Sequence, residues 1–583
     1  MSTTRNTSPG LRRPVYRGRA ASAAVAAALL FSACGDSDTG SQSTGGSSSD
    51  TAAEANRPLA TSNNRVETSE RAEISVGGGL TQEALEEDSS DEEMSEPERT
   101  VESDQAAVGE PTRIDRPSVT EPNEEPDAEF QDYGTNPFVD TIDDPFSTFA
   151  MDVDAASYTL ARNWLLNGSL PDPAGVRVEE FVNHFDQDYQ NPTHDTFAVY
   201  ADGAPHPFVS DDTYVLRIGI AAREVSERER DDANLTIVVD VSGSMNADGK
   251  FDTVIESLEI LVDELGPNDT ISIISYSDDA RVVLEPTDVR DLDEIDDAIG
   301  RLRTGGSTNA EAGLSLGFDV ADEMFERNTN NKIILISDGV ANVGNTTAGG
   351  IFERISESSR RGIDLIAIGV GISDYNDVLL EQLANQGDGF YAYVDSSSEA
   401  ERIFATDLVA ALQVVAEESK IQVEFNDNNV VEYRLLGFEN REIADEDFRN
   451  DRVDAGEIGA GHTVTALYEI RLARGVDAGS GDEIGTVNVR WNEPGSRNAD
   501  EISGVVTTDL LSSRYNDASD HFRLSATAAT FAEVLRDSRY MRGVSFDELL
   551  DEAIEIANSL GNNSQADELV DLIDIASSLD ARR

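Results

Sequence analysis

The sequence predicts an α/β protein in which a doubly wound, mostly parallel sheet is inserted into a β-sandwich, with a small helical bundle at the carboxyl end. Three patterns support this prediction. Apolar, strand-like runs alternate with helical stretches between residues 231 and 411, which we call the central domain. Strand patterns lie on both sides of that domain, and helical periodicity continues from about 516 to the end. A chain of 583 residues is also too long for one hydrophobic core.

The amino end has the pattern of a secretory signal. Residues 1–33 contain arginines, no acidic residue and an apolar run of about 12 residues, which is too short to span a bilayer. Small residues then precede Cys34, as in the lipobox of bacterial lipoproteins, although Phe31 stands where that motif prefers leucine. We therefore expect an extracytoplasmic protein held to a membrane by lipid on Cys34. The alternative is an ordinary cleaved signal that happens to contain a cysteine.

Residues 34–130 are expected to form a disordered, acidic tether. No Phe, Tyr or Trp occurs from 35 to 129, where a Ser/Thr/Gly-rich stretch is followed by an acidic one. Such a segment cannot bury enough apolar surface to offset its chain entropy. We expect it to lift the folded part off the membrane, and a weaker alternative is a segment that takes up calcium.

The charge of the chain excludes one class of partner. With 114 Asp and Glu against 44 Lys and Arg, the formal net charge is -70, which repels the phosphates of nucleic acids. We therefore predict no nucleic-acid partner and no membrane contact beyond the lipid. Only three basic residues are lysines, Lys250, Lys332 and Lys420. A salt-adapted surface and a GC-rich genome both explain this scarcity.

The central domain has the alternation of a parallel sheet covered by helices. The predicted strands are 235–239, 270–276, 332–337, 363–369 and 389–394. The predicted helices are 251–265, 310–327, 350–361 and 377–385. In sheets of this type, ligands bind outside the carboxyl ends of the strands.

Polar residues follow two of these strands and precede one helix. Asp240, Ser242 and Ser244 follow the first strand, Thr308 precedes the helix at 310, and Asp338 follows the strand at 332. These side chains offer hard oxygen atoms, with no sulfur or imidazole among them. Such a set suits Mg²⁺ first, with Mn²⁺ or Ca²⁺ as alternatives, and does not suit zinc or copper. The competing interpretation is that the two aspartates merely cap the following loops.

These three elements together resemble the von Willebrand factor A (VWA) family, whose fold is a Rossmann-like sheet carrying a metal-ion-dependent adhesion site. By that resemblance, Ser242, Ser244 and Thr308 supply hydroxyl oxygens to a divalent metal. Asp240 and Asp338 act mainly through water or through hydrogen bonds to the ligands. A metal held by neutral hydroxyls is left short of negative charge, so the resemblance implies that a partner protein fills its open position with an acidic side chain.

The flanking regions resemble a family of bacterial VWA lipoproteins whose role is poorly defined. The resemblance covers about 136–583 and rests on the segments 149–166, 433–441, 454–468 and 522–531. Sandwich strands are predicted at 196–200, 213–221, 421–425, 430–436, 464–471 and 484–490, and helices at 522–536, 545–560 and 565–579. The predicted units are a signal (1–33), the tether (34–130), an N-terminal VWA-associated region (131–230), the VWA domain (231–411), a β-sandwich part (412–515) and C-terminal helices (516–583).

The sequence favours a binding protein over an enzyme. No histidine lies in the central domain, and no HExxH motif occurs in the chain. A metal-dependent hydrolase that uses carboxylate bases stays open as an alternative, as does an envelope assembly factor in which the metal only stabilises the fold. Asp152 and Asp154 form a DxD pattern that also occurs in aspartyl-phosphate phosphatases. The lysine which that mechanism needs is found downstream only within or after the VWA domain.

Overall fold

The computed structural model describes residues 57–63, 130, 132–151, 156–209, 212–225, 230–247, 249–327, 329–338, 348–371, 377–450, 453, 455–496 and 498–582. The predicted signal, Cys34 and most of the predicted tether lie outside these residues, and so do Asp152 and Asp154. None of the helices within the described ranges is long and apolar enough to cross a membrane.

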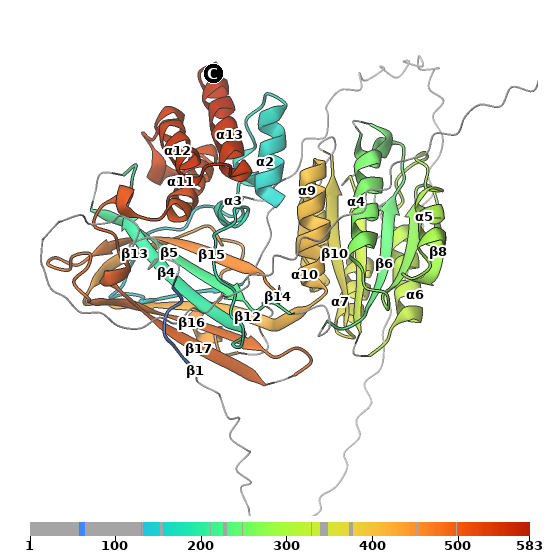
Figure 1. Cartoon of the computed structure of the whole chain (residues 1–583), viewed down its shortest axis with the longest axis horizontal. Coiled ribbons are helices and arrows are strands. Elements are labelled where there is room, and N and C mark those ends of the chain that lie inside the picture. The colour runs from blue at the N-terminus through green and yellow to red at the C-terminus, as the bar shows by residue number, and fades with distance from the viewer. Residues whose placement is uncertain are drawn as a thin grey trace, which may run out of the picture. The chain divides into compact units, whose positions relative to one another are not determined.

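The central domain contains a six-stranded sheet in the order β11-β10-β9-β6-β7-β8, in which β8 alone is antiparallel to its neighbour (Figure 1). The chain runs from β6 outward through β7 and β8, and then returns to the other side of β6 with β9. The strand order therefore reverses between β6 and β9, where sheets of this type bind ligands. The strands are β6 (Ala233–Asp240), β7 (Thr270–Tyr276), β8 (Ala280–Asp288), β9 (Asn330–Ser337), β10 (Ile363–Val370) and β11 (Tyr391–Val394).

Helices cover both faces of this sheet. Leu258 of α4 and Phe404, in a π-helical turn (Arg402–Asp407), belong to the core on one face, whereas Leu314 of α6 and Leu383 of α8 belong to the other core. One face carries α4 (Lys250–Glu264), α5 (Leu292–Ile299), α9 (Ser397–Glu401) and α10 (Leu408–Ala411); the other carries α6 (Ala310–Met324), α7 (Ala348–Ser359) and α8 (Asp377–Gln386). The predicted doubly wound fold is confirmed. The sequence did not predict β8, because this edge strand buries few of its side chains.

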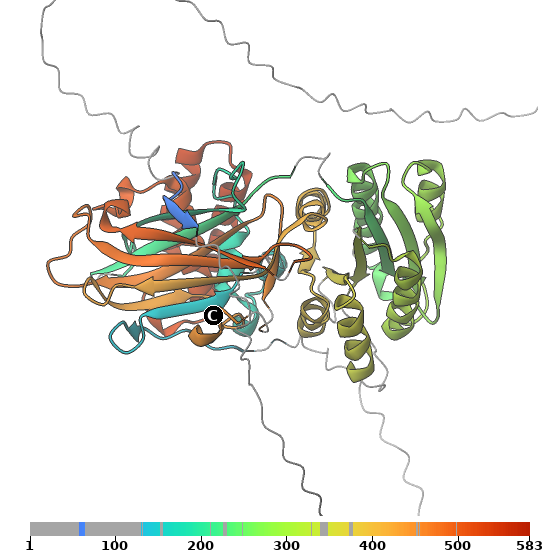
Figure 2. The ribbon, with the colours of Figure 1, turned by 90° about the horizontal axis from the view of Figure 1, so that it is seen from below.

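Strands from both sides of the central domain form two stacked sheets (Figure 2). One has the order β1-β17-β16-β12-β14, with β3 also paired to β12, and the other has the order β2-β13-β15-β5-β4. Ile218 of β5 and Val487 of β16 lie in the core shared by the two sheets. Because β4 and β5 precede the central domain and β12 follows it, the domain is inserted into a sandwich, as predicted. The strands are β1 (Thr61–Asn63), β2 (Val139–Asp140), β3 (Phe146–Ala150), β4 (Phe197–Pro205), β5 (Thr213–Ala222), β12 (Val414–Phe425), β13 (Val430–Leu436), β14 (Gly456–Gly459), β15 (Thr463–Leu472), β16 (Glu483–Asn492) and β17 (Ala499–Thr507).

The carboxyl-terminal helices pack on the second sheet. Phe531 and Leu549 share a core with Val215 of β5 and Leu467 of β15. Two helices that precede the central domain, α2 (Ala156–Leu166) and α3 (Val178–Asn183), contribute to the same core. Figure 1 shows α2 next to α13. The predicted helical region is therefore present as α11 (Asp520–Leu535), α12 (Phe546–Leu560) and α13 (Ser564–Asp580).

One short part of the predicted tether is ordered, which corrects the prediction for those residues. Strand β1 pairs antiparallel with β17, with Ser62 opposite Ser503. The Leu59 amide donates to the Val199 carbonyl at 2.7 Å, and the Leu59 side chain packs against the sandwich core. The edge of β17 offers unpaired backbone groups, and pairing with β1 satisfies some of them. Composition alone did not reveal this strand because a single leucine anchors it.

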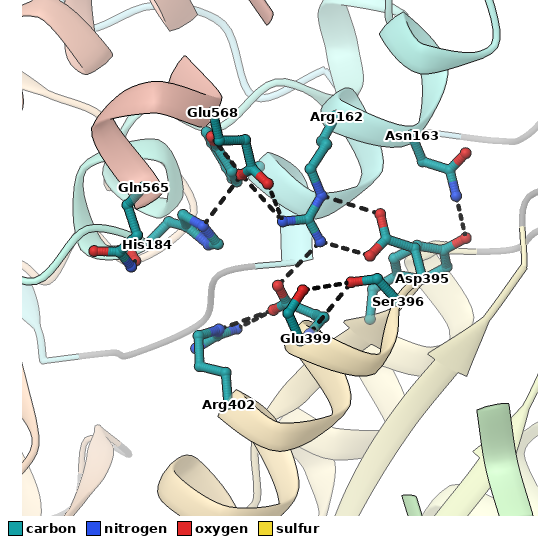
Figure 3. A network of polar contacts seen from close by, with 12 residues as sticks. Arg162, Asn163, His184, Asp395, Ser396, Glu399, Arg402, Gln565 and Glu568 are labelled. Atoms are coloured by element: carbon teal, nitrogen blue, oxygen red, sulfur yellow. Dashed lines mark hydrogen bonds and ion pairs between the residues drawn. The ribbon is translucent and has the colours of Figure 1, made fainter. Parts of the chain in front are cut away.

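A network of buried charges joins the central domain to the helices on the sandwich (Figure 3). The Arg162 guanidinium on α2 contacts Asp395 at 2.5 Å, Glu399 of α9 at 3.0 Å and Glu568 of α13 at 3.2 Å. Burial acts to raise the pKa of Glu399, but the charges of nearby arginines lower it to about 2. Burial lowers the pKa of His184 to about 3, so this imidazole is neutral at pH 7. The contacts of Arg162 with Asp395 and Glu399 are buried, and that with Glu568 is partly exposed; together they hold the carboxyl end of the central domain against α2.

Candidate metal centre

The strand order brings two of the predicted elements together. Asp240 ends β6 and Ser337 ends β9, and these parallel strands are direct neighbours with Val239 opposite Ile336. The Ser337 hydroxyl donates to Asp240 Oδ2 at 3.2 Å. Asp240 and Asp338 are both fully buried. The two predicted aspartates therefore flank the point where the strand order reverses.

The loop after β6 aims two hydroxyls at the same place. The Ser242 amide donates to Asp240 Oδ1 at 2.7 Å, which folds the loop back over the end of its own strand. The Ser242 and Ser244 hydroxyl oxygens lie 2.9 Å apart. Ser242 is buried and Ser244 is partly exposed. One face of this hydroxyl pair is therefore open to a ligand while the other is fixed by the strand end.

The loop that carries Thr308 is bonded to the same strand end. The Gly243 amide donates to the Gly306 carbonyl at 3.0 Å, and the Gly305 amide donates to the Val241 carbonyl at 2.7 Å. Gly306 has φ 91°, a backbone conformation that favours glycine. Thr308 is buried two residues later, just before Asn309 caps α6 through the Ala312 amide. The structure thus places all five predicted residues on three adjoining loops.

Asp240 and Asp338 bring two carboxylates close together at this edge of the sheet. Burial, together with the charge of Asp338, raises the pKa of Asp240 to about 6. Lys250 Nζ lies 3.2 Å from Asp338 Oδ2. The other oxygen, Asp338 Oδ1, is buried and has no hydrogen-bond partner among the described residues. A buried carboxylate oxygen without a partner is unfavourable, so a cation or its bound water fits this atom well.

The chemistry of the donors fits a hard divalent cation. Three hydroxyls and two carboxylates are all oxygen donors, which Mg²⁺, Mn²⁺ and Ca²⁺ prefer. Within the described ranges, no group of three or more His, Cys, Asp or Glu side chains is arranged to hold a metal ion. A metal at this place would therefore depend on Ser242, Ser244 and Thr308. The loop-capping interpretation explains the Ser242 amide bond to Asp240 but leaves Asp338 Oδ1 unexplained.

Lys250 is the residue near the centre that the sequence did not single out. It begins α4 and is almost fully buried against Asp338. In the sequence, Lys250 stands out only because lysine is rare: three of the 44 basic residues are lysines. That scarcity has two explanations unrelated to function, so the pairing with Asp338 emerges only from the fold.

Family models match almost all of the described chain. The model described as von Willebrand factor type A domain matches residues 234–406, and one described as von Willebrand factor matches 124–216. A third, described as Uncharacterized protein YfbK, C-terminal, matches 410–579. The first of these matches spans every residue of the candidate centre.

Similar proteins include bacterial and vertebrate chains. Uncharacterized protein YfbK of Escherichia coli (strain K12) is 33% identical over 445 residues, which is 72% of this chain and 76% of that protein. Inter-alpha-trypsin inhibitor heavy chain H2 of Homo sapiens is 27% identical over 29% of this chain and 19% of its own length. A solved von Willebrand factor type A structure from Catenulispora acidiphila covers 64% of this chain and 89% of its own, with 16% identity and a TM-score of 0.38.

Proposed function

Because the chain belongs to the YfbK family of VWA-domain proteins, we propose that it binds an acidic side chain of a partner protein through a divalent cation. VWA domains often mediate protein interactions, and many bind a divalent metal. In our proposal Ser242, Ser244 and Thr308 hold the cation, with Mg²⁺ as the first candidate. A bound cation supplies positive charge and an open coordination position to the partner's carboxylate.

One observation supports this proposal over the alternative functions. The hydroxyls of Ser242 and Ser244 lie 2.9 Å apart after β6, and Asp338 follows the neighbouring strand β9, with its Oδ1 buried and without a partner among the described residues. The loops that carry these groups follow β6 and β9, between which the strand order reverses and where sheets of this type bind ligands. The hydroxyl donors are neutral, and Lys250 partly neutralises the Asp338 carboxylate. A cation bound here therefore keeps positive charge that attracts an anionic group.

The proposal also puts the protein outside the cytoplasm. The basic and apolar pattern of residues 1–33, followed by Cys34, supports export and lipid attachment. We propose a protein anchored to an envelope membrane by lipid on Cys34, with its VWA domain exposed to partners. Labelling with a radioactive or alkyne fatty acid would attach to the parent and not to Cys34→Ser, whereas equal labelling would contradict the anchor.

The alternative functions differ in what metal removal does. A binding protein loses its partner in chelator while its fold stays intact, whereas an assembly factor with a purely structural metal unfolds in chelator. A hydrolase would turn over a substrate, and the described centre contains no imidazole that could serve as a base.

The proposed function is tested by capture of envelope proteins on the immobilised chain. We expect one or more proteins to be retained in Mg²⁺ and released by chelator, with circular dichroism unchanged. The Ser242→Ala/Ser244→Ala variant is expected to retain none of them. Retention that is the same in Mg²⁺, in chelator and on this variant would contradict the proposal.

A further inference from the structure

All three lysines of this chain are buried, whereas its arginines include both buried and exposed ones. Lys250, Lys332 and Lys420 are all at most 4% exposed. Lys332 pairs with Asp364 at 2.5 Å, and Lys420 donates to the Asn450 carbonyl at 2.8 Å. A slender ammonium enters narrow buried places that a planar guanidinium does not fit. Each lysine of this chain is a buried cation with a defined partner.

Lys250 occupies a position that is unfavourable for its own helix. It is the first residue of α4, where the helix dipole repels a positive charge. The preceding residue, Gly249, has φ 77° and provides no side-chain cap. Local helix stability therefore does not explain a lysine here, and its contact with Asp338 does.

The fold also leaves a slot for this side chain. Gly371 follows β10 at the same edge of the sheet and has φ 88°. A Cβ on Gly371 would lie 2.1 Å from Lys250 Cε and 2.9 Å from Lys250 Nζ. Any larger residue at 371 would displace the ammonium from Asp338. Two separate segments of the chain thus fix Lys250 beside the candidate centre.

The charges of the centre can be added once Lys250 is included. Asp240 and Asp338 carry two negative charges, which a divalent cation alone would cancel. The Lys250 ammonium, 3.2 Å from Asp338 Oδ2, adds one positive charge to these groups. In a buried place such a charge acts strongly on nearby ions, because the local dielectric is lower than that of water.

We propose that Lys250 sets the selectivity of the loaded centre: it weakens the hold on the cation and strengthens the attraction for an anionic group of the partner. This inference rests on the proposed metal site and adds a residue to it. The two carboxylate oxygens of Asp338 have different roles in this proposal. Oδ2 contacts Lys250, and Oδ1 is available to the metal or to its bound water. Without Lys250 the loaded centre would carry one positive charge less and would attract a carboxylate less.

The test measures two affinities at pH 8 on the full chain, with Mn²⁺ and acetate as probes. In Lys250→Met, we expect Mn²⁺ to bind at least about threefold more tightly, because a nearby like charge is gone. Acetate is expected to bind the Mn²⁺-loaded variant at least about threefold more weakly than the loaded parent. A residue that only supported the fold would weaken both affinities when replaced.

Two further variants make the result decisive. Lys332→Met removes another buried lysine of the central domain, on β9, and is expected to change neither affinity. Lys250→Gln removes the charge but keeps a hydrogen-bond donor for Asp338, so it covers the case in which Lys250→Met does not fold. Unchanged or weaker Mn²⁺ binding by the folded neutral variant, or unchanged acetate binding, would overturn the role of Lys250. Failure of the parent to bind Mn²⁺ would instead overturn the metal site itself.

Discussion

Replacing Arg434 with methionine is expected to lower the free energy of unfolding by about 3–5 kcal/mol, because it leaves buried carboxylates without their main counter-ion. Arg434 of β13 is fully buried and contacts Glu469 of β15 at 2.6 Å and Glu533 of α11 at 3.2 Å. Its guanidinium also lies 4.2 Å from the ring centre of Tyr540. Urea unfolding followed by circular dichroism measures the effect.

The large expected effect follows from desolvation. Burial acts to raise the pKa of Glu533, but the charges of Arg434 and Arg536 outweigh it and lower that pKa. The exposed pair Arg514–Asp517 provides the control, and Arg514→Met should change stability by less than about 0.5 kcal/mol. If Arg434→Met were as mild as this control, the C-terminal helices would not be fixed to the sandwich through Arg434.

Replacing Asp240 with asparagine is expected to weaken Mn²⁺ binding by about 10- to 100-fold, the usual range for residues that support metal ligands. Asparagine keeps the shape and one acceptor oxygen for the Ser242 amide, so the loop is expected to stay in place. It removes one of two buried like charges, since the charge of Asp338 contributes to the raised pKa of Asp240. The metal-free variant should therefore melt at the same temperature as the parent or higher.

This combination separates a binding residue from a structural one. Mn²⁺ affinity is followed by electron paramagnetic resonance of the free ion, and stability by thermal melting in chelator. The matched variant Asp269→Asn removes another fully buried aspartate of the central domain, which accepts from the Ala233 amide at 2.8 Å. It should lower the melting temperature and leave Mn²⁺ affinity unchanged. Parent-like Mn²⁺ affinity in Asp240→Asn would remove Asp240 from the site.

The central sheet was predictable because its signal is local and strong. Parallel strands buried on both faces, such as β6 and β9, have almost continuous apolar sequences. Polar residues that follow such strands meet at the same edge of the sheet, so the sequence positions of Asp240 and Asp338 alone indicate that the two lie close together. Thr308 followed from its position before a helix and from the resemblance to the VWA family.

Other features could not be predicted because they depend on contacts between distant parts of the chain. Arg162 contacts Asp395 and Glu568, which lie 233 and 406 residues away. Strand β1 forms only because β17 has a free edge, and no local pattern marks it. The role of Lys250 depends on the position of Gly371, which lies across the sheet edge and far along the chain. Short-range periodicity contains no information about such partners.

The measurement that tests the central claim most directly is a calorimetric titration of Mg²⁺, Mn²⁺ and Ca²⁺ into the chain from Gly35 onward. The same titration is made on Ser242→Ala/Ser244→Ala and on Ser559→Ala/Ser577→Ala, a pair of exposed hydroxyls on the C-terminal helices. We predict saturable binding of one ion in the parent and in the helix variant, and none in Ser242→Ala/Ser244→Ala. Equal binding in all three would mean that the acidic surface takes up cations without a site, and would contradict the account.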